Sequence, residues 1–234
     1  ARARGSQAHS WVVMGDGEQV KGQVAEARRL AAKEKLTNLT ALVDWNDIQI
    51  SGRLEEVMPV NIPALWAADG WQVVECDGHD YNALYRAMKA AKEASVPTVI
   101  LCRTTMGKGV SFMENIPDYH GKPAAGEKLE QALKELGSDI SLFNAVLEDR
   151  KGPLPKGRHV APEKPALALG VPHTYTKEDK KDNRGAFGKA LAEVGELNYK
   201  KADATPMLVF DCDLAGSVKV DGFAKLCPDN YVEA

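Results

Sequence analysis

The sequence predicts an α/β protein in which helices cover both faces of a mostly parallel sheet. One observation predicts the fold class, and two others bound the size of the core and the number of domains. Short apolar segments alternate with longer amphipathic ones, which is typical of strands joined by helices. Hydrophobic residues make up 44% of the 234 residues, enough for a sizeable core, and charged residues make up an ordinary 27%. The length corresponds to one large domain or to one domain and part of a second.

The first half of the chain is expected to hold four strands, two crossover helices and a short closing helix. Apolar runs predict the strands, over residues 11–14, 39–43, 71–76 and 98–102. Apolar residues three and four positions apart predict helices over 19–35 and 81–94. A shorter helix over 129–136, with Gly137 as its stop, completes this unit, which we assign to residues 1–149.

The second half begins with a proline-rich connection. Prolines at positions 153, 155, 162, 165 and 172 lie in or directly beside it, which predicts a linker over 150–173. A helix over 184–196 and a strand over 207–210 then predict the start of a second α/β unit, at 174–234. Because the sequence has no initiator Met and stops within an expected element, we expect a fragment of a longer protein.

Composition argues against several classes of function. Lys and Arg number 30 and Asp and Glu 33, a formal net charge of -3 without long blocks of either sign, so a nucleic-acid partner is disfavoured. The 4 cysteines form no CxxC pair, which disfavours a zinc knuckle or a dense disulfide framework. No apolar run approaches the roughly 20 residues that span a bilayer, and the first residues lack a secretion signal. We therefore expect a cytoplasmic protein without a membrane partner.

Polar residues follow the first two predicted strands at their carboxyl ends. Gly15, Asp16 and Gly17 follow the first strand, and Asn46 follows the second. Neighbouring parallel strands end at the same edge of a sheet, where ligands bind in this fold class. Asp16 and Asn46 can supply two hard oxygens to Mg²⁺ or Ca²⁺, which would neutralise a diphosphate lying over the glycine turn. The glycines can adopt positive φ and let a phosphate approach the backbone. A helix N-cap role would explain Asp16 but leave Asn46 unexplained.

These residues belong to segments that resemble a known family. The segment GDGEQVKGQVAEARRLAAKEKLTNLTALVDWNDIQISG resembles the thiamine diphosphate motif of transketolases. TTMGKGVSFMENIPDYHGKP resembles the end of the same cofactor domain, and RGAFGKAL with FDCDLAGSVKVDGFAKLCPDNYVEA resembles the start of the pyrimidine-binding domain. The resemblance implies a diphosphate- and metal-binding domain over 1–149 and the beginning of a pyrimidine-binding domain over 174–234.

The resemblance also implies roles for single residues of the first domain. Asp16 and Asn46 would hold the metal ion through their side chains, and Ile48 would hold it through its main-chain oxygen. Gly15 and Gly17 would contact the diphosphate, and Ile50 would pack on the thiazolium ring of the cofactor. The histidine of the YHGKP segment, His120, would lie near the diphosphate and the reacting carbonyl.

In the second domain, the resemblance makes Arg184 and Ser217 ligands of the sugar phosphate. Asp213 matches an acidic residue that lies close to the cofactor of the partner subunit. The implied assembly is a homodimer with active sites at the subunit interface.

The implied activity is the transfer of a two-carbon ketol unit between sugar phosphates, in the pentose phosphate pathway, with thiamine diphosphate and Mg²⁺ or Ca²⁺. Two alternatives stay open. One is a deoxyxylulose phosphate synthase or another ketol transferase that uses the same cofactor, although the context of His120 favours transketolase. The other is a non-catalytic chain that binds the cofactor while a partner supplies the rest of the site.

The sequence departs from the family pattern in two places. Many transketolases have a glutamate at the position of Lys21, in a network that links the two active sites, and Glu18 one turn earlier could pair with this lysine. The glutamate that protonates the aminopyrimidine of the cofactor is expected beyond Ala234. We therefore expect the 234-residue chain alone to lack ketol transfer activity.

Overall fold

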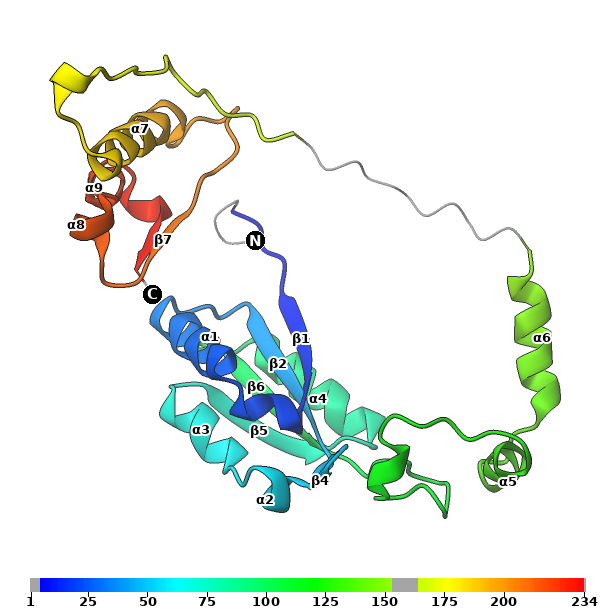
Figure 1. The fold of residues 1–234 in the computed structure, drawn as a ribbon. Coiled ribbons are helices and arrows are strands. Elements are labelled where there is room, and N and C mark those ends of the chain that lie inside the picture. The colour runs from blue at the N-terminus through cyan, green and yellow to red at the C-terminus, as the bar shows by residue number, and fades with distance from the viewer. Residues whose placement is uncertain (1–4, 153–163, 234) are drawn as a thin grey trace. The chain divides into compact units, whose positions relative to one another are not determined.

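The computed structural model describes residues 5–152 and 164–233 (Figure 1). The chain forms two compact units, one of residues 8–158 and one of residues 159–234 together with 1–7. Part of the predicted linker, with the prolines at 153, 155 and 162, lies outside the described residues. Residues 164–176 contain neither helix nor strand.

A four-stranded parallel sheet forms the centre of the first unit, in the order β1-β2-β6-β5. Its strands are β1 (Ser10–Gly15), β2 (Leu39–Trp45), β5 (Gln72–Asp77) and β6 (Thr98–Arg103). Residues 98–102 of β6 are all buried, as expected of a parallel strand that is covered on both faces. The α/β fold class and the four predicted strands are confirmed.

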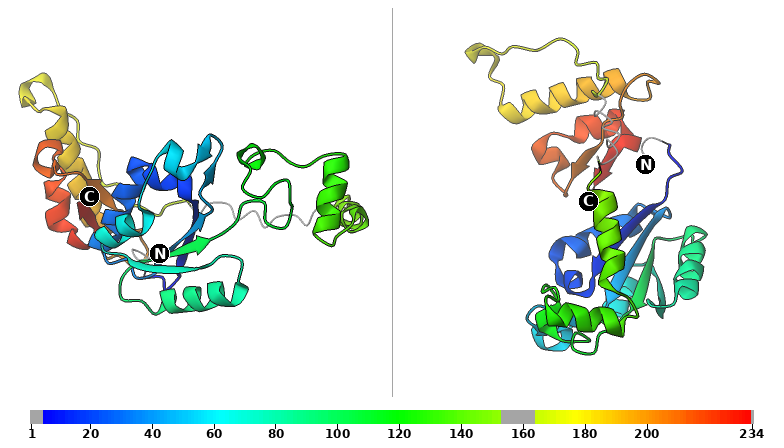
Figure 2. Two further views of the ribbon diagram at one scale, coloured as in Figure 1. Left: turned by 90° about the horizontal axis from the view of Figure 1, so that it is seen from below. Right: turned by 90° about the vertical axis from the view of Figure 1, so that its right-hand side faces the viewer.

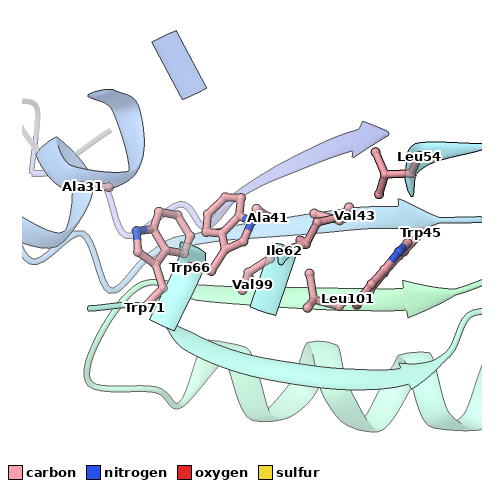
Figure 3. Packing of buried hydrophobic residues seen from close by; sticks show 10 residues of the cluster. All are labelled: Ala31, Ala41, Val43, Trp45, Leu54, Ile62, Trp66, Trp71, Val99 and Leu101. Carbon is pink, nitrogen blue, oxygen red and sulfur yellow. The ribbon is translucent and has the colours of Figure 1, made fainter. Parts of the chain in front are cut away.

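Helices α1 (Gly22–Lys33) and α3 (Ile62–Ala68) pack on one face of this sheet. Figure 3 shows their side chains, including Ala31 and Trp66, against Val99 and its neighbours on the strands. Trp66 is 2% exposed and stacks edge-on against Trp71 with 4.6 Å between ring centroids. This cluster is the larger of the two hydrophobic clusters of the unit.

The opposite face of the sheet is covered by α4 (Tyr81–Lys92), as the views in Figure 2 show. Ala87 and Ala91 of this helix contact Ile100 and Cys102 of β6. Successive residues of a strand point to opposite faces, so Ile100 and Cys102 face α4 while Val99 and Leu101 face α1 and α3. The helix that the sequence predicts over 81–94 is therefore confirmed.

The helix predicted over 19–35 is divided in two. Asp16–Val20 forms the 3-10 helix η2, Lys21 is extended at φ -72° and ψ 131°, and α1 begins at Gly22. The cause is tertiary: the buried Gln19 side chain bonds to both Gly15 O (2.8 Å) and Trp66 Nε1 (3.0 Å). Those two contacts hold the chain in a tighter turn than the apolar periodicity predicts.

Shorter elements complete the first unit. They are β3 (Ile48–Gln49), β4 (Gly52–Arg53), α2 (Leu54–Val57), η3 (Pro117–Tyr119), α5 (Glu127–Glu135) and α6 (Ile140–Arg150). β3 and β4 form a small antiparallel hairpin directly after β2. Among the described residues, no helix has the length and apolar character needed to cross a membrane.

The second unit contains a two-stranded parallel sheet and a pair of packed helices. Its elements are η4 (Lys177–Asp179), α7 (Asn183–Asn198), β7 (Val209–Asp211), α8 (Ala215–Val218), α9 (Asp221–Leu226), η5 (Pro228–Asn230) and β8 (Tyr231–Glu233). A Cβ at Gly195 would lie 2.6 Å from the ring of Phe223, which is fully buried, so a glycine is needed where α7 packs on α9. The predicted helix and strand of this unit are confirmed.

Candidate functional site

The carboxyl ends of three strands meet at one edge of the parallel sheet. Gly15 of β1 is paired with Asp44 of β2, and Asp44 is paired with Cys102 of β6. A cavity of about 500 Å³ lies at this edge. It is lined by Gly15, Asp16, Gly17, Glu18, Lys21, Asp44, Asn46, Ile48, Gln49, Ile50, Ser51 and His120. Every site residue predicted in the first unit therefore lines the same cavity.

Asp16 connects the end of β1 to the loop that follows β2. Its side chain is largely buried, with 3% of the residue exposed. Its Oδ2 accepts hydrogen bonds from the backbone N–H groups of Asn46 (3.1 Å) and Asp47 (2.6 Å). Burial raises the pKa of this carboxyl, and the backbone hydrogen bonds from Asp47, Gly17 and Asn46 oppose that rise. A cation at this place would favour the ionised form.

The Asn46 amide is held on both of its polar atoms. Its Oδ1 accepts from the backbone N–H of Ile48 (3.0 Å), and its Nδ2 donates to Asp44 Oδ1 (3.4 Å). Asp47, with φ at 61°, turns the chain between Asn46 and Ile48 and thereby allows the first of these contacts. The side-chain oxygen of Asn46 and the backbone of Ile48 thus share one tight turn.

The two glycines of the first turn differ from the expectation. Neither has a positive φ: Gly15 lies at -88°, and Gly17 is outside the left-handed region. A Cβ on Gly15 would meet nothing within 4 Å, so its backbone is open to approach. A Cβ on Gly17 would lie 3.3 Å from Gln49 Cδ. A side chain at position 17 would therefore require Gln49 to move by a few tenths of an ångström.

The β3–β4 hairpin lines the cavity with residues 48–51, of which Gln49 and Ile50 stand out. Gln49 Nε2 is buried and has no hydrogen-bond partner within the described structure. Ile50 is 75% exposed although it is large and apolar. An unsatisfied donor and an uncovered aliphatic side chain beside one cavity are features that a bound polar and aromatic ligand would complete.

His120 reaches the cavity from the loop before α5. It directly follows η3, and its backbone N–H donates to Pro117 O (2.9 Å). The preceding Tyr119 packs edge-on against Phe112, at 5.6 Å between ring centroids. Lys128 of α5 lies 5.3 Å from both ring centroids and donates to the Tyr119 hydroxyl at 2.6 Å. These contacts fix the loop that carries the histidine.

The predicted pair of Glu18 and Lys21 is present, with 3.3 Å between Oε1 and Nζ. Glu18 Oε2 also accepts from the backbone N–H of Gly15 (3.0 Å). The hydrogen bond from Gly15 N–H is the main cause that lowers the pKa of Glu18; burial opposes it, and Lys21 adds to the lowering. Lys21 therefore stands at the rim of a cavity that also contains the carboxylates of Asp16, Glu18 and Asp44.

Arg184, Ser217 and Asp213 belong to the second unit and are described within it. Arg184 Nη1 donates to the main-chain oxygen of Ser217 at 3.5 Å, so α7 and α8 bring these two residues together. Arg184 Nε also lies 3.6 Å from Asp182 Oδ2. Asp213, with φ at 60°, is in the turn between β7 and α8.

Sequence reasoning missed four residues that organise the cavity. Asp44 and Gln49 line the cavity, and Gln19 and Thr104 donate hydrogen bonds to two lining residues, Gly15 and Asp44. Asp44 and Thr104 could have been identified from the sequence, because Asp44 lies near the carboxyl end of β2 and Thr104 directly follows β6, and in a parallel sheet such ends lie at one edge. Gln19 and Gln49 had no such signal, since their roles depend on tertiary contacts with Trp66 and Gly17.

A second cavity, of about 660 Å³, is lined in part by Trp45, Asp47 and Arg103. The Arg103 guanidinium lies 3.1 Å from the centroid of the Trp45 ring and forms ion pairs with Glu75 (3.5 Å) and Asp47 (3.9 Å). The positive charge of Arg103 is thus balanced by the carboxylates of Glu75 and Asp47. Trp45 is itself 9% exposed and belongs to the larger hydrophobic cluster.

The donor chemistry of the first cavity fits a hard divalent cation. Nowhere in the described ranges do three His, Cys, Asp or Glu side chains form a possible metal site. The expected ligand set is instead one carboxylate, one amide oxygen and one main-chain carbonyl, which are oxygen donors of the kind that Mg²⁺ and Ca²⁺ prefer. The open backbone at Gly15 and the unpaired Gln49 amide fit an oxygen-rich anion beside it.

Comparison with known proteins gives one consistent result. Residues 3–151 match the family model of the transketolase thiamine diphosphate binding domain. The chain is 38% identical over 133 residues to an apulose-4-phosphate transketolase subunit of Phocaeicola vulgatus, covering 56% of this chain and 47% of the relative. It is 30% identical over 227 residues to transketolase of Homo sapiens, covering 95% of this chain and 34% of the relative.

A solved structure agrees with the fold. Transketolase from Campylobacter jejuni superposes with a TM-score of 0.68 at 24% identity, over 91% of this chain and 36% of that chain. This likeness supports the α/β architecture alone. The chain spans less than half the length of each of these relatives.

Proposed function

Because this chain belongs to the transketolase family, matched through its thiamine diphosphate binding domain, we propose that it takes part in transferring a two-carbon ketol unit between sugar phosphates. Thiamine diphosphate and a divalent metal ion, Mg²⁺ or Ca²⁺, are the proposed cofactors. One observation carries the proposal: Asp16, Asn46 and Ile48 line one cavity together with Gly15 and Gly17.

The proposed metal ligands are the Asp16 carboxylate, the Asn46 side-chain oxygen and the Ile48 main-chain oxygen. Charge supports this assignment. The carboxylates of Asp16, Glu18 and Asp44 line the cavity and would repel an unaccompanied diphosphate. A divalent ion between these carboxylates and the diphosphate would remove that repulsion. Metal and diphosphate are therefore expected to bind together.

The remaining residues of the first unit would fix the rest of the cofactor. The Gly15 and Gly17 backbone would lie against the diphosphate, and Ile50 would pack on the thiazolium ring with its exposed side chain. Bound thiamine diphosphate supplies the electron sink that allows the carbon–carbon bond of a ketose phosphate to break. His120 would donate or accept a hydrogen bond at the diphosphate or at the reacting carbonyl oxygen.

Arg184 and Ser217 are the proposed ligands of the sugar phosphate. A guanidinium binds phosphate through charge-assisted hydrogen bonds, and the Arg184 side chain is 65% exposed and thus reachable. Asp213 is proposed to lie close to the cofactor held by a second subunit. This arrangement requires a homodimer with its active sites at the subunit interface.

We place this activity in the pentose phosphate pathway and in the cytoplasm. The free thiols of Cys76, Cys102, Cys212 and Cys227 are compatible with a reducing compartment. The relatives described above are named transketolases, which favours this function over deoxyxylulose phosphate synthase.

Binding of the cofactor tests the proposal most directly. Calorimetric titration of the chain with thiamine diphosphate should give saturable binding with Mg²⁺ present and none with excess chelator. Asn46→Leu should remove this binding, and Asn144→Leu, at an exposed position of α6, should leave it intact. If the affinity for thiamine diphosphate were the same without Mg²⁺ and in Asn46→Leu, the assignment would be contradicted.

Activity is measured separately, because the chain covers only part of its relatives. Ketol transfer between two pentose phosphates is followed with and without a polypeptide that supplies the remaining pyrimidine-binding domain. Transfer only in the mixture would support a divided enzyme. Cofactor binding without transfer in either case would favour the non-catalytic alternative.

A further inference from the structure

Asp44 occupies a position that the proposed ligand set does not use. It is the second-last residue of β2 and lines the cavity. Its Oδ1 accepts two hydrogen bonds, one from the Thr104 hydroxyl and one from Asn46 Nδ2 at 3.4 Å. The Asp44 carboxylate thus connects a residue that follows β6 with the amide of a proposed metal ligand.

Thr104 is itself fixed in place. It directly follows β6, and its backbone N–H donates to Trp45 O at 3.2 Å, which extends the pairing of β6 with β2 by one step. The Thr104 hydroxyl is carried by a short side chain on backbone that is paired with β2, so its position relative to Asp44 is set by the sheet. Donors from two different segments of the chain thus converge on one oxygen of Asp44.

The orientation of the Asn46 amide decides whether it can bind a cation. Its two ends are close in size, but only the oxygen is a metal ligand, and the NH₂ group is a donor. In the observed orientation, Oδ1 accepts from Ile48 N–H at 3.0 Å and Nδ2 faces the Asp44 carboxylate. A flipped amide would place NH₂ against the Ile48 N–H and oxygen against the Asp44 oxygen. Both contacts would then be repulsive.

We propose that Asp44 and Thr104 are positioning residues, which hold the Asn46 amide with its oxygen available to the divalent ion. The inference rests on the proposed function for the identity of that ion. The hydrogen bonds that it uses lie wholly within the described chain. Residues that orient metal ligands commonly change metal affinity by about 10- to 100-fold when they are replaced.

The decisive variant is Thr104→Val, which keeps the shape of the side chain and removes the hydroxyl while leaving Asp44 and its charge in place. Mn²⁺ is the probe, titrated into the chain with thiamine diphosphate and followed by the electron paramagnetic resonance of free Mn²⁺. We expect Thr104→Val to weaken Mn²⁺ binding by about 10-fold. Thr104→Ser should restore the affinity to within about twofold, because it returns the hydroxyl.

Thr105→Val is the matched control. Thr105 is the next residue, and the contact that fixes it uses its backbone N–H, which donates to His79 Nε2 at 2.8 Å. This variant should bind Mn²⁺ like the unaltered chain. Thermal unfolding of all variants should show equal midpoints, which separates a loss of affinity from a loss of fold.

A second readout does not require the metal. The side-chain NH₂ protons of Asn46, observed by NMR in the metal-free chain, should shift in Thr104→Val and return in Thr104→Ser. An unchanged Asn46 signal together with unchanged Mn²⁺ affinity in Thr104→Val would overturn the inference. If the unaltered chain bound no Mn²⁺, the proposed function would fail, and the NMR comparison would still decide whether Thr104 orients the amide.

Discussion

The cavity at the end of the parallel sheet and the Arg184–Ser217 contact of the second unit hold their polar groups in different ways. In the cavity, Asp16 is 3% exposed and accepts two backbone hydrogen bonds from the loop after β2. In the second unit, the Arg184 side chain is 65% exposed and its hydrogen bond to Ser217 O is long, at 3.5 Å. The first region is organised before any ligand arrives, and the second presents a side chain that is free to rearrange.

This difference determines how substitutions act. Asp16 is expected to bind the ligand and also accepts hydrogen bonds from backbone N–H groups, so a substitution that tests binding alone must keep those hydrogen bonds. An exposed arginine can be removed with little structural effect, and its contribution to binding can be measured by itself. The following variants test this contrast, from the largest expected effect to the smallest.

Asp16→Asn should have the largest effect. Asparagine keeps a side-chain oxygen for the N–H groups of Asn46 and Asp47 but removes the charge that a divalent ion needs. We expect the affinity for thiamine diphosphate with Mg²⁺ to fall by at least about 100-fold, because replacing residues that only orient metal ligands already costs about 10- to 100-fold. Calorimetry measures this affinity, and circular dichroism should be unchanged. Asp149→Asn on the exposed face of α6 is the control, and equal affinities would refute the metal site.

Trp66→Phe tests whether the core supports the cavity. The indole Nε1 donates to Gln19 Oε1 at 3.0 Å, and Gln19 Nε2 donates to Gly15 O at 2.8 Å. Phenylalanine leaves the buried Gln19 oxygen without its donor, which should lower the free energy of unfolding by about 1–3 kcal/mol. Urea denaturation measures this change. Tyr85→Phe, at a position 69% exposed, should shift stability by less than about 0.5 kcal/mol.

The same Trp66→Phe variant should also weaken cofactor binding, because Gln19 holds the glycine turn. A variant that is destabilised but binds the cofactor with unchanged affinity would show that core and cavity are independent. The cavity would then not depend on the core for its organisation, contrary to the description given above.

Arg184→Ala tests the other region, in an active transketolase that contains this chain. Loss of a charge-assisted contact to phosphate should lower kcat/KM for phosphorylated sugars by about 10-fold or more. Unphosphorylated sugars should be affected little, and cofactor affinity should be unchanged. Steady-state kinetics on paired substrates measures the difference. Equal losses on both kinds of substrate would assign Arg184 to the structure of α7 instead.

The contrast also explains how far the sequence can predict the site. The sequence predicts that Asp16, Asn46 and His120 lie together, and all three line the cavity. For Asp16 and Asn46 the reason is local, because each follows a strand whose apolar run is visible in the sequence. The carboxyl ends of neighbouring parallel strands lie at the same edge of the sheet, so the two residues are expected to be close together. His120 is identified through the resemblance alone, since nothing in its own loop predicts that it reaches the cavity.

Long-range contacts account for what the sequence does not reveal. Thr104 lies beside Asp44 because β6 is inserted next to β2, although β5 comes before it in the chain. The interruption at Lys21 depends on Gln19 and Trp66, which are 47 residues apart. α3 has 7 residues and too short an apolar pattern to be recognised, yet its Ile62 and Trp66 are among the most buried residues.

Lys21→Met should have the smallest effect. Lys21 and Glu18 form an exposed pair, with side chains 60% and 44% exposed, so the free energy of unfolding should change by less than about 0.5 kcal/mol. Glu18 keeps its hydrogen bond from Gly15 N–H, and the turn should stay intact.

Cofactor affinity should nevertheless respond to the loss of this charge. Among the described residues that line the cavity, Lys21 is the permanent cation, set against the carboxylates of Asp16, Glu18 and Asp44. An anionic diphosphate should therefore bind the Lys21→Met chain about two- to threefold more weakly at low salt, and the difference should vanish near 1 M salt, where the Debye length is about 3 Å. Lys151→Met is the matched control, because Lys151 forms the same type of exposed pair with Glu148 on α6. If both variants bound the cofactor alike at low salt, Lys21 would serve only its pair with Glu18, and the cavity would rely on the metal ion alone to offset its carboxylates.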